Sequence, residues 1–216
     1  MERAFETIML AKEDGISTIT LNRLEVLNAL SPMMFDELNA VFAEVADDES
    51  TRVVIITGAG RAFCAGGDVK SDVSIARAMG PFEARKYIHT YVYKKIVEME
   101  KPVIAAVNGI ATGGGLDLAL ACDIRFASEK ARFGEVFVNM GLIPDLGGIY
   151  FLPRLIGLGK AKLLASTGDL IDAWEAERIG LVDKVLPADE LDSAARQLAE
   201  RLANGPAKAN ALINVP

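Results

Sequence analysis

The sequence predicts an α/β fold in which buried parallel strands alternate with helices. Two apolar runs, residues 53–56 and 103–107, are continuous, and each begins with a β-branched residue. Such runs are typical of strands that are covered on both faces. Helical patterns precede and follow them, so strand and helix alternate along most of the chain. Each run leads into a glycine-containing segment, which predicts a loop at the carboxyl end of each strand.

Local signals define the other expected elements. Residues 7–12 and 16–21 are expected to form a hairpin, because Asp14-Gly15 between them favours a tight turn. Ser31 is a good N-cap, and Pro32 suits the first position of a helix that runs to about Asp47. Further helices are expected at 82–99, 116–121, 148–155, 159–167, 172–179 and 188–202, and a further strand at 123–127.

The size and charge of the chain limit its function. Its 216 residues predict a single domain over 1–216, with a core to about residue 190 and the start of a short or truncated helical region at 191–216. The net charge of −7 gives no general attraction for nucleic acid, so a nucleic-acid partner is not expected.

Cellular location is predicted from what the sequence does not contain. The start of the chain lacks the apolar core of a signal peptide, and no apolar run is long enough to span a membrane. Cys64 and Cys122 form no CxxC pattern, and we expect both to be reduced. A cytoplasmic protein without a membrane partner is therefore expected.

Two glycine-rich segments follow the buried strands, at residues 63–68 (Phe-Cys-Ala-Gly-Gly-Asp) and 108–117. Neither has the glycine spacing of a dinucleotide-binding or P-loop fingerprint. Either one alone could be a flexible turn. Two such loops at the carboxyl ends of core strands, with free N–H groups at a helix start, together indicate a site that stabilises negative charge.

In combination, these loops resemble those of the crotonase (enoyl-CoA hydratase/isomerase) family. Similar segments also occur at 22–30, 121–125, 133–134, 141–144, 152–157 and 176–182, so the resemblance covers nearly the whole chain. It implies a crotonase-like spiral of ββα units with C-terminal helices, assembled as a homotrimer or hexamer. It also implies an enzyme that binds an acyl-CoA thioester and stabilises its enolate, with no cofactor besides the CoA of the substrate.

The resemblance also implies positions for the site. The thioester oxygen would bind the N–H groups of Ala65 and Gly114, which form an oxyanion hole. The residues expected to contact substrate are Ala65, Gly66, Gly67, Asp68, Gly113, Gly114 and Phe137. Backbone donors can stabilise an enolate without a metal, and no metal-ligand set is visible, since His89 is the only histidine.

The acid–base residues distinguish the subfamilies. Hydratases use two glutamates, and these positions correspond to Asp117 and Phe137, so the water-activating pair is incomplete in this chain. Asp145 instead lies where crotonase-family isomerases carry their catalytic aspartate, including the dienoyl-CoA and the ring-opening epoxide isomerases. A single carboxylate can remove a proton and return it at another carbon. We therefore expect an isomerase with Asp145 as base and Asp117 in support.

Other interpretations remain open for both residues and for the protein. Asp145 could cap the next helix, and Asp117 could be a carboxylate favoured in a first helical turn. The alternative activity is hydration of a 2-enoyl-CoA. The alternative of another class is a non-catalytic acyl-CoA-binding or structural subunit.

Overall fold

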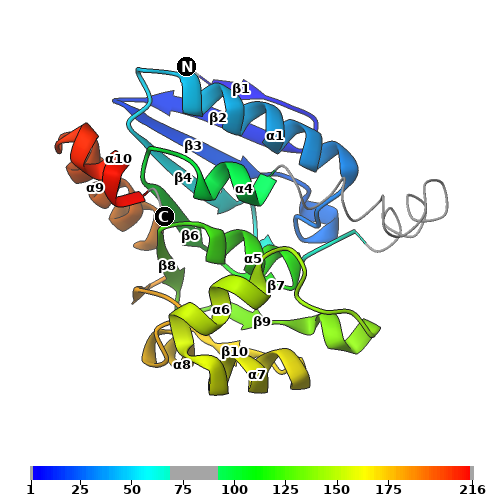
Figure 1. The fold of residues 1–216 in the computed structure, drawn as a ribbon. Coiled ribbons are helices and arrows are strands. Elements are labelled where there is room, and N and C mark those ends of the chain that lie inside the picture. The colour runs from blue at the N-terminus through cyan, green and yellow to red at the C-terminus, as the bar shows by residue number, and fades with distance from the viewer. Residues whose placement is uncertain (1, 69–91, 215–216) are drawn as a thin grey trace.

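The computed structural model describes residues 2–68 and 92–214, which form two β-sheets and the helices around them (Figure 1). The larger sheet has the order β1-β2-β3-β4-β6-β8-β11, and the smaller sheet has the order β10-β9-β7-β5. The strands are β1 (Glu2–Ala4), β2 (Ile8–Glu13), β3 (Ile16–Leu21), β4 (Val53–Gly58), β5 (Ala62–Cys64), β6 (Val103–Val107), β7 (Ile110–Thr112), β8 (Ile124–Ser128), β9 (Arg132–Gly134), β10 (Ile171–Asp172) and β11 (Lys184–Leu186).

The α-helices are α1 (Pro32–Asp47), α4 (Val92–Val97), α5 (Gly114–Ala121), α6 (Gly148–Ile156), α7 (Leu158–Thr167), α8 (Ala173–Arg178), α9 (Leu191–Ala203) and α10 (Ala207–Asn214). Two short 3-10 helices are η1 (Leu24–Val26) and η2 (Val136–Met140). Of the helix expected at 82–99, the part before Val92 lies outside the described residues. None of the helices among the described residues has the length and apolar character needed to cross a bilayer.

The chain winds as a spiral that visits the two sheets in turn. Strands β4, β6 and β8 pair in parallel in the large sheet, and the strand after each of them, β5, β7 and β9, pairs in parallel in the small sheet. Each turn is thus two strands followed by helix, which is the expected ββα unit. The carboxyl ends of β5 and β7 consequently lie side by side, which brings the two glycine-rich loops together.

The hairpin and first helix form where the sequence predicts them. Asp14 and Gly15 both have positive φ, as a tight hairpin turn between β2 and β3 requires. Ser31 caps α1, accepting a hydrogen bond from the backbone N–H of Met34 at 3.2 Å. Figure 1 shows α1 lying over the first strands of the large sheet, with which it shares the main core.

The large sheet is covered on both faces, which explains the continuous apolar runs. In β4, Val54 points into the main core and Val53 into a second cluster on the opposite face. Helix α9 covers that second face with Leu191, Ala195 and Ala199, all of them buried. Successive side chains of a strand alternate between faces, so a strand buried on both sides needs apolar residues throughout.

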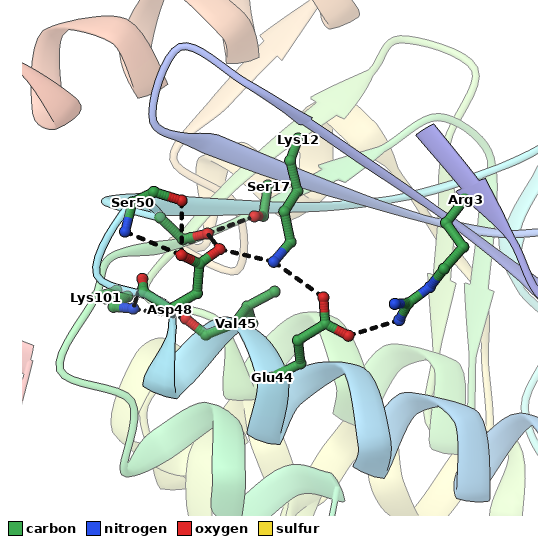
Figure 2. A network of polar contacts seen from close by, with 9 residues as sticks. Arg3, Lys12, Ser17, Glu44, Val45, Asp48, Ser50 and Lys101 are labelled. Carbon is green, nitrogen blue, oxygen red and sulfur yellow. Dashed lines mark hydrogen bonds and ion pairs between the residues drawn. The ribbon is translucent and has the colours of Figure 1, made fainter. Parts of the chain in front are cut away.

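A polar network connects β2 to the end of α1 (Figure 2). Asp48 follows the last residue of α1 and accepts hydrogen bonds from Lys12 Nζ at 2.7 Å, Ser50 Oγ at 2.6 Å and Thr51 Oγ1 at 2.9 Å. These donors hold the pKa of the Asp48 carboxyl well below its usual range, with the Lys12 ammonium contributing most. The network therefore fixes the turn that leads from α1 into β4.

We predict that Asp48→Ala lowers the free energy of unfolding by about 2 kcal/mol at neutral pH, since several hydrogen bonds are lost together. A carboxyl with a lowered folded-state pKa contributes its stability above its ordinary pKa and loses it on acidification. The difference from the unaltered protein should therefore shrink as the pH falls below about 4. Urea unfolding at several pH values measures this, with the exposed neighbour Asp47→Ala as control. An equal effect of both variants would contradict the assignment.

Candidate active site

Two loops meet at the carboxyl ends of β5 and β7. Thr112 Oγ1 donates a hydrogen bond to the carbonyl oxygen of Ala65 at 3.0 Å, and Gly113 N donates to Gly134 O at 2.9 Å. Gly66 has a φ of +97°, and a Cβ atom added to it would lie 2.7 Å from Thr112 O and 3.4 Å from Gly114 N. The two backbones are therefore in direct contact, and a side chain at Gly66 would separate them.

The expectation that Ala65 supplies an oxyanion donor is wrong. Its N–H already donates to the carbonyl oxygen of Leu27 at 3.0 Å. The N–H of Asp68 donates to Leu30 O, whereas no acceptor among the described residues bonds the N–H of Gly67, which lies between them in the same loop. The family motif directed attention to this loop, but only the hydrogen bonds show which of its N–H groups is free.

The second expected donor, Gly114, is well placed. It is the first residue of α5, where a backbone N–H has no acceptor within the helix and the helix dipole favours negative charge. Tyr93 Oη donates a hydrogen bond to the Gly114 carbonyl oxygen at 2.9 Å, which holds this end of α5 in place. Gly67 and Gly114 are therefore the backbone donors that could together bind an oxyanion.

Two of the expected substrate-contacting side chains lie close to this loop pair. Phe137 is 7% exposed, and its ring lies 3.7 Å from the position of a Cβ atom added to Gly113. It can shape the site but cannot transfer a proton. Asp68 pairs with Arg23 at 3.1 Å, and Arg23 Nη1 also donates to Ala29 O at 2.7 Å. The Asp68 carboxylate thus holds the loop in place through its ion pair with Arg23.

A pair of buried carboxyl groups lies behind the loops. Asp117 on α5 and Glu135, directly after β9, are both completely buried. A Cβ atom added to Gly148 would lie 2.3 Å from Asp117 Oδ1 and 2.8 Å from Glu135 Oε1. No N–H or O–H group of the described residues makes a well-formed hydrogen bond to any of the four carboxyl oxygens. Each of the two groups is consequently a large part of the other's electrostatic environment.

Burial raises the pKa of both carboxyls, because each is separated from water. The charge of Asp117 raises the pKa of Glu135 further, while Glu135 and the backbone N–H of Gly148 oppose the rise at Asp117. Burial and mutual repulsion therefore make it unfavourable for both carboxyls to be ionised at once.

Glu135 is a site residue that the sequence analysis missed. The family comparison directed attention to Phe137, two positions later, where hydratases carry their second glutamate. A signal was available in the sequence, because Glu135 lies between Phe133 and Phe137. A carboxylate in such an apolar segment is expected to be buried, and charged residues are seldom buried without a partner.

Asp145 lies in the connection before α6 and is half-buried. The N-cap of α6 is Gly147, so the interpretation of Asp145 as the helix cap is wrong. Asp145 lines an open groove of about 390 Å³ with Tyr93, Leu146 and Phe151. Its negative charge contributes to raising the pKa of Asp117, which places it near the buried pair. Asp145 is thus the one of these three residues that lines a groove, although its Oδ2 atom is buried.

Comparison with known proteins shows the family of the chain. Residues 11–214 match the model of the family described as Enoyl-CoA hydratase/isomerase. The chain belongs to this family. Within the part of the chain that the structure describes, no three His, Cys, Asp or Glu side chains are grouped to hold a metal ion.

Individual relatives show how closely this hydratase/isomerase resembles other members. It is 42% identical to a short-chain-enoyl-CoA hydratase of Clostridium acetobutylicum over 90% of this chain and 74% of that protein. It is 38% identical to the 1,2-epoxyphenylacetyl-CoA isomerase of Escherichia coli over 93% of this chain and 78% of that protein. An enoyl-CoA hydratase structure from Bacillus anthracis superimposes with a TM-score of 0.92 at 39% identity, covering 97% of this chain and 81% of that one.

We predict that Gly66→Ala lowers kcat/KM by about 100-fold or more, as loss of an oxyanion donor does. The added methyl group would displace the Gly67 loop from Gly114. The control is Gly141→Ala, since Gly141 also has positive φ (+67°) but no atom lies within 4 Å of its added Cβ. Steady-state kinetics of both variants measure the difference. Equal activities would show that the loop contact is not needed for catalysis.

We also predict that Gly148→Ala is destabilised by roughly 1–3 kcal/mol, because its methyl group would overlap the Asp117–Glu135 pair. Gly159 is also near the start of a helix, but its added Cβ meets nothing within 4 Å. Gly159→Ala should therefore gain roughly 0.5–1 kcal/mol through its higher helix propensity. Thermal or urea unfolding of the two variants tests whether their free energies of unfolding change in opposite directions.

Proposed function

We propose that this enzyme moves a carbon–carbon double bond within an acyl-CoA thioester, with Asp145 as the single base. The observation that carries this proposal is the difference in access among the three carboxylates. Asp145 lines the groove, whereas Asp117 and Glu135 are completely buried against each other. A base that takes a proton from carbon must reach the substrate, and this requirement favours Asp145 over the two buried carboxyls.

The proposed reaction follows from this geometry. The thioester oxygen binds between the N–H groups of Gly67 and Gly114. The carboxylate of Asp145 takes a proton from the α-carbon of a 3-enoyl thioester, and the electrons of that C–H bond move to the oxygen as a dienolate. The protonated Asp145 returns the proton at the γ-carbon, which leaves the double bond conjugated with the thioester. Each oxyanion donor contributes about 3–4 kcal/mol to stabilising the charged intermediate.

A second candidate function is hydration of a 2-enoyl-CoA. Its supporting observation is Glu135, which provides Asp117 with the second carboxyl group that Phe137 does not supply. Relatives named as hydratases include the short-chain-enoyl-CoA hydratase of Clostridium acetobutylicum and the crotonyl-CoA hydratase of Syntrophomonas wolfei. Under this proposal the pair would activate water and Asp145 would have an accessory role.

Self-association as a homotrimer or hexamer, a cytoplasmic location and a reaction without a metal or organic cofactor remain proposals. Exposed apolar side chains around η2, α6 and α7 support self-association, because such surface tends to be covered between subunits. They include Met140, Ile143, Ile149, Leu158 and Leu163, each of them more than 40% exposed.

We predict that the enzyme raises the conjugated-thioester absorbance of a 3-enoyl-CoA in heavy water without adding water to the product. Asp145→Asn should lower that rate by about 100-fold or more, since a general base is removed. Asp189→Asn, a change from Asp to Asn at an exposed position, is the matched control.

The same variants distinguish the activities. A hydratase would add water to a 2-enoyl-CoA and would lose that activity in Asp117→Asn while retaining it in Asp145→Asn. If the protein binds CoA thioesters but converts neither substrate, and dienoyl and ring-containing thioesters also fail, it is a non-catalytic acyl-CoA-binding protein.

A further inference from the structure

Among residues 2–68 and 92–214, no cation compensates the charge of the buried pair of Asp117 and Glu135. The described titratable groups that interact with the pair are Tyr93 of α4 and Asp145 before α6, with Cys64 of β5 next to Tyr93, and none of these is a cation. Two ionised carboxylates in contact repel each other strongly when water is excluded, so such pairs retain one proton between them.

Three separate elements hold the pair together. Asp117 is carried by α5, Glu135 follows β9, and Gly148 at the start of α6 leaves room for both carboxyl groups only because it has no side chain. The residue before Glu135 also accepts the hydrogen bond from Gly113 N, so Glu135 is tied to the oxyanion loop. The contact between the carboxyls is therefore built into the fold.

We propose that Glu135 is a positioning residue that shares one proton with Asp117, so that the pair carries a single negative charge beside the oxyanion loop. Its role in turnover rests on the enolate chemistry proposed above. The enolate charge develops at Gly114, the first residue of the helix that carries Asp117. A doubly ionised pair would repel that charge. The shared proton lowers the negative charge of the pair from two to one and so weakens the repulsion.

Glu135→Gln is the sharpest variant, because its amide N–H₂ can donate to Asp117 in place of the carboxyl proton and cannot be titrated. We expect kcat at neutral pH to stay within about fivefold of the unaltered enzyme. The unaltered enzyme should lose activity at alkaline pH, when the pair gives up its shared proton, and Glu135→Gln should lack this loss. A purely structural role would lower kcat equally at all pH values.

The Glu135→Gln variant changes one titratable group and retains Tyr93, Cys64 and Asp145. The comparison therefore isolates the effect of Glu135. If the alkaline loss of activity persists unchanged in this variant, it belongs to one of them and the proposal is overturned. Separate pH profiles of kcat and kcat/KM show whether the change affects the bound complex or the free enzyme.

Stability provides a measurement that needs no substrate. The folded-state pKa of Glu135 is raised by burial, so the stability from its proton is present below the ordinary pKa and is lost as the pH rises toward the folded value. The unfolding constant of the unaltered protein, relative to Glu135→Gln, should therefore increase by up to about tenfold per pH unit over this range. Urea unfolding between about pH 5 and 9 measures this ratio.

Asp117→Asn replaces the other carboxyl of the pair by an amide. It provides the stability test if Glu135→Gln does not fold. It should weaken the same pH dependence of stability, because the charge of Asp117 is removed and Asn can donate to an ionised Glu135. If no thioester is converted but both variants flatten the pH dependence, the proton sharing stands and the proposed function fails. If thioesters are converted but stability depends on pH equally in all three proteins, the proton sharing is overturned.

Discussion

The close backbone contact between successive turns of the spiral is the constraint on which the site depends. The start of α5 packs so tightly on β5 that a Cβ atom added to Gly115 would lie 2.1 Å from Cys64 O. A similar contact brings the backbones of Gly66 and Gly114 together, although they are almost fifty residues apart. Backbone donors fixed in this way need no reorganisation when charge develops between them, which is the basis of electrostatic catalysis.

The contact also determines how the carboxyl groups behave. Tight packing excludes water from Asp117 and Glu135, so their charges are governed by each other, whereas Asp145 at the groove remains accessible. Three carboxyl groups of similar intrinsic acidity thus acquire different environments through burial and contact. The negative net charge of the chain makes this separation more important, because a site that stabilises an anion cannot hold several ionised carboxylates nearby.

Much of the fold could be predicted from the sequence because its signals are local. The turn at Asp14, the Ser31 cap and the apolar run at Val103–Val107 each act over a few residues, and each element forms where expected. The three-residue strands β5, β7 and β9 could not be predicted, since segments so short have no periodicity to detect. They pair only because the spiral places them side by side.

The sequence by itself determined the α/β class and the two glycine-rich loops, because these depend on residue type and local spacing. Its resemblance to the family directed attention to Asp117 and Asp145. Only the tertiary structure decided that Ala65 N–H is already bonded to Leu27 O and that Glu135 reaches Asp117. A hydrogen-bond partner and a buried contact are set by segments distant in sequence, and the spiral alone brings those segments together.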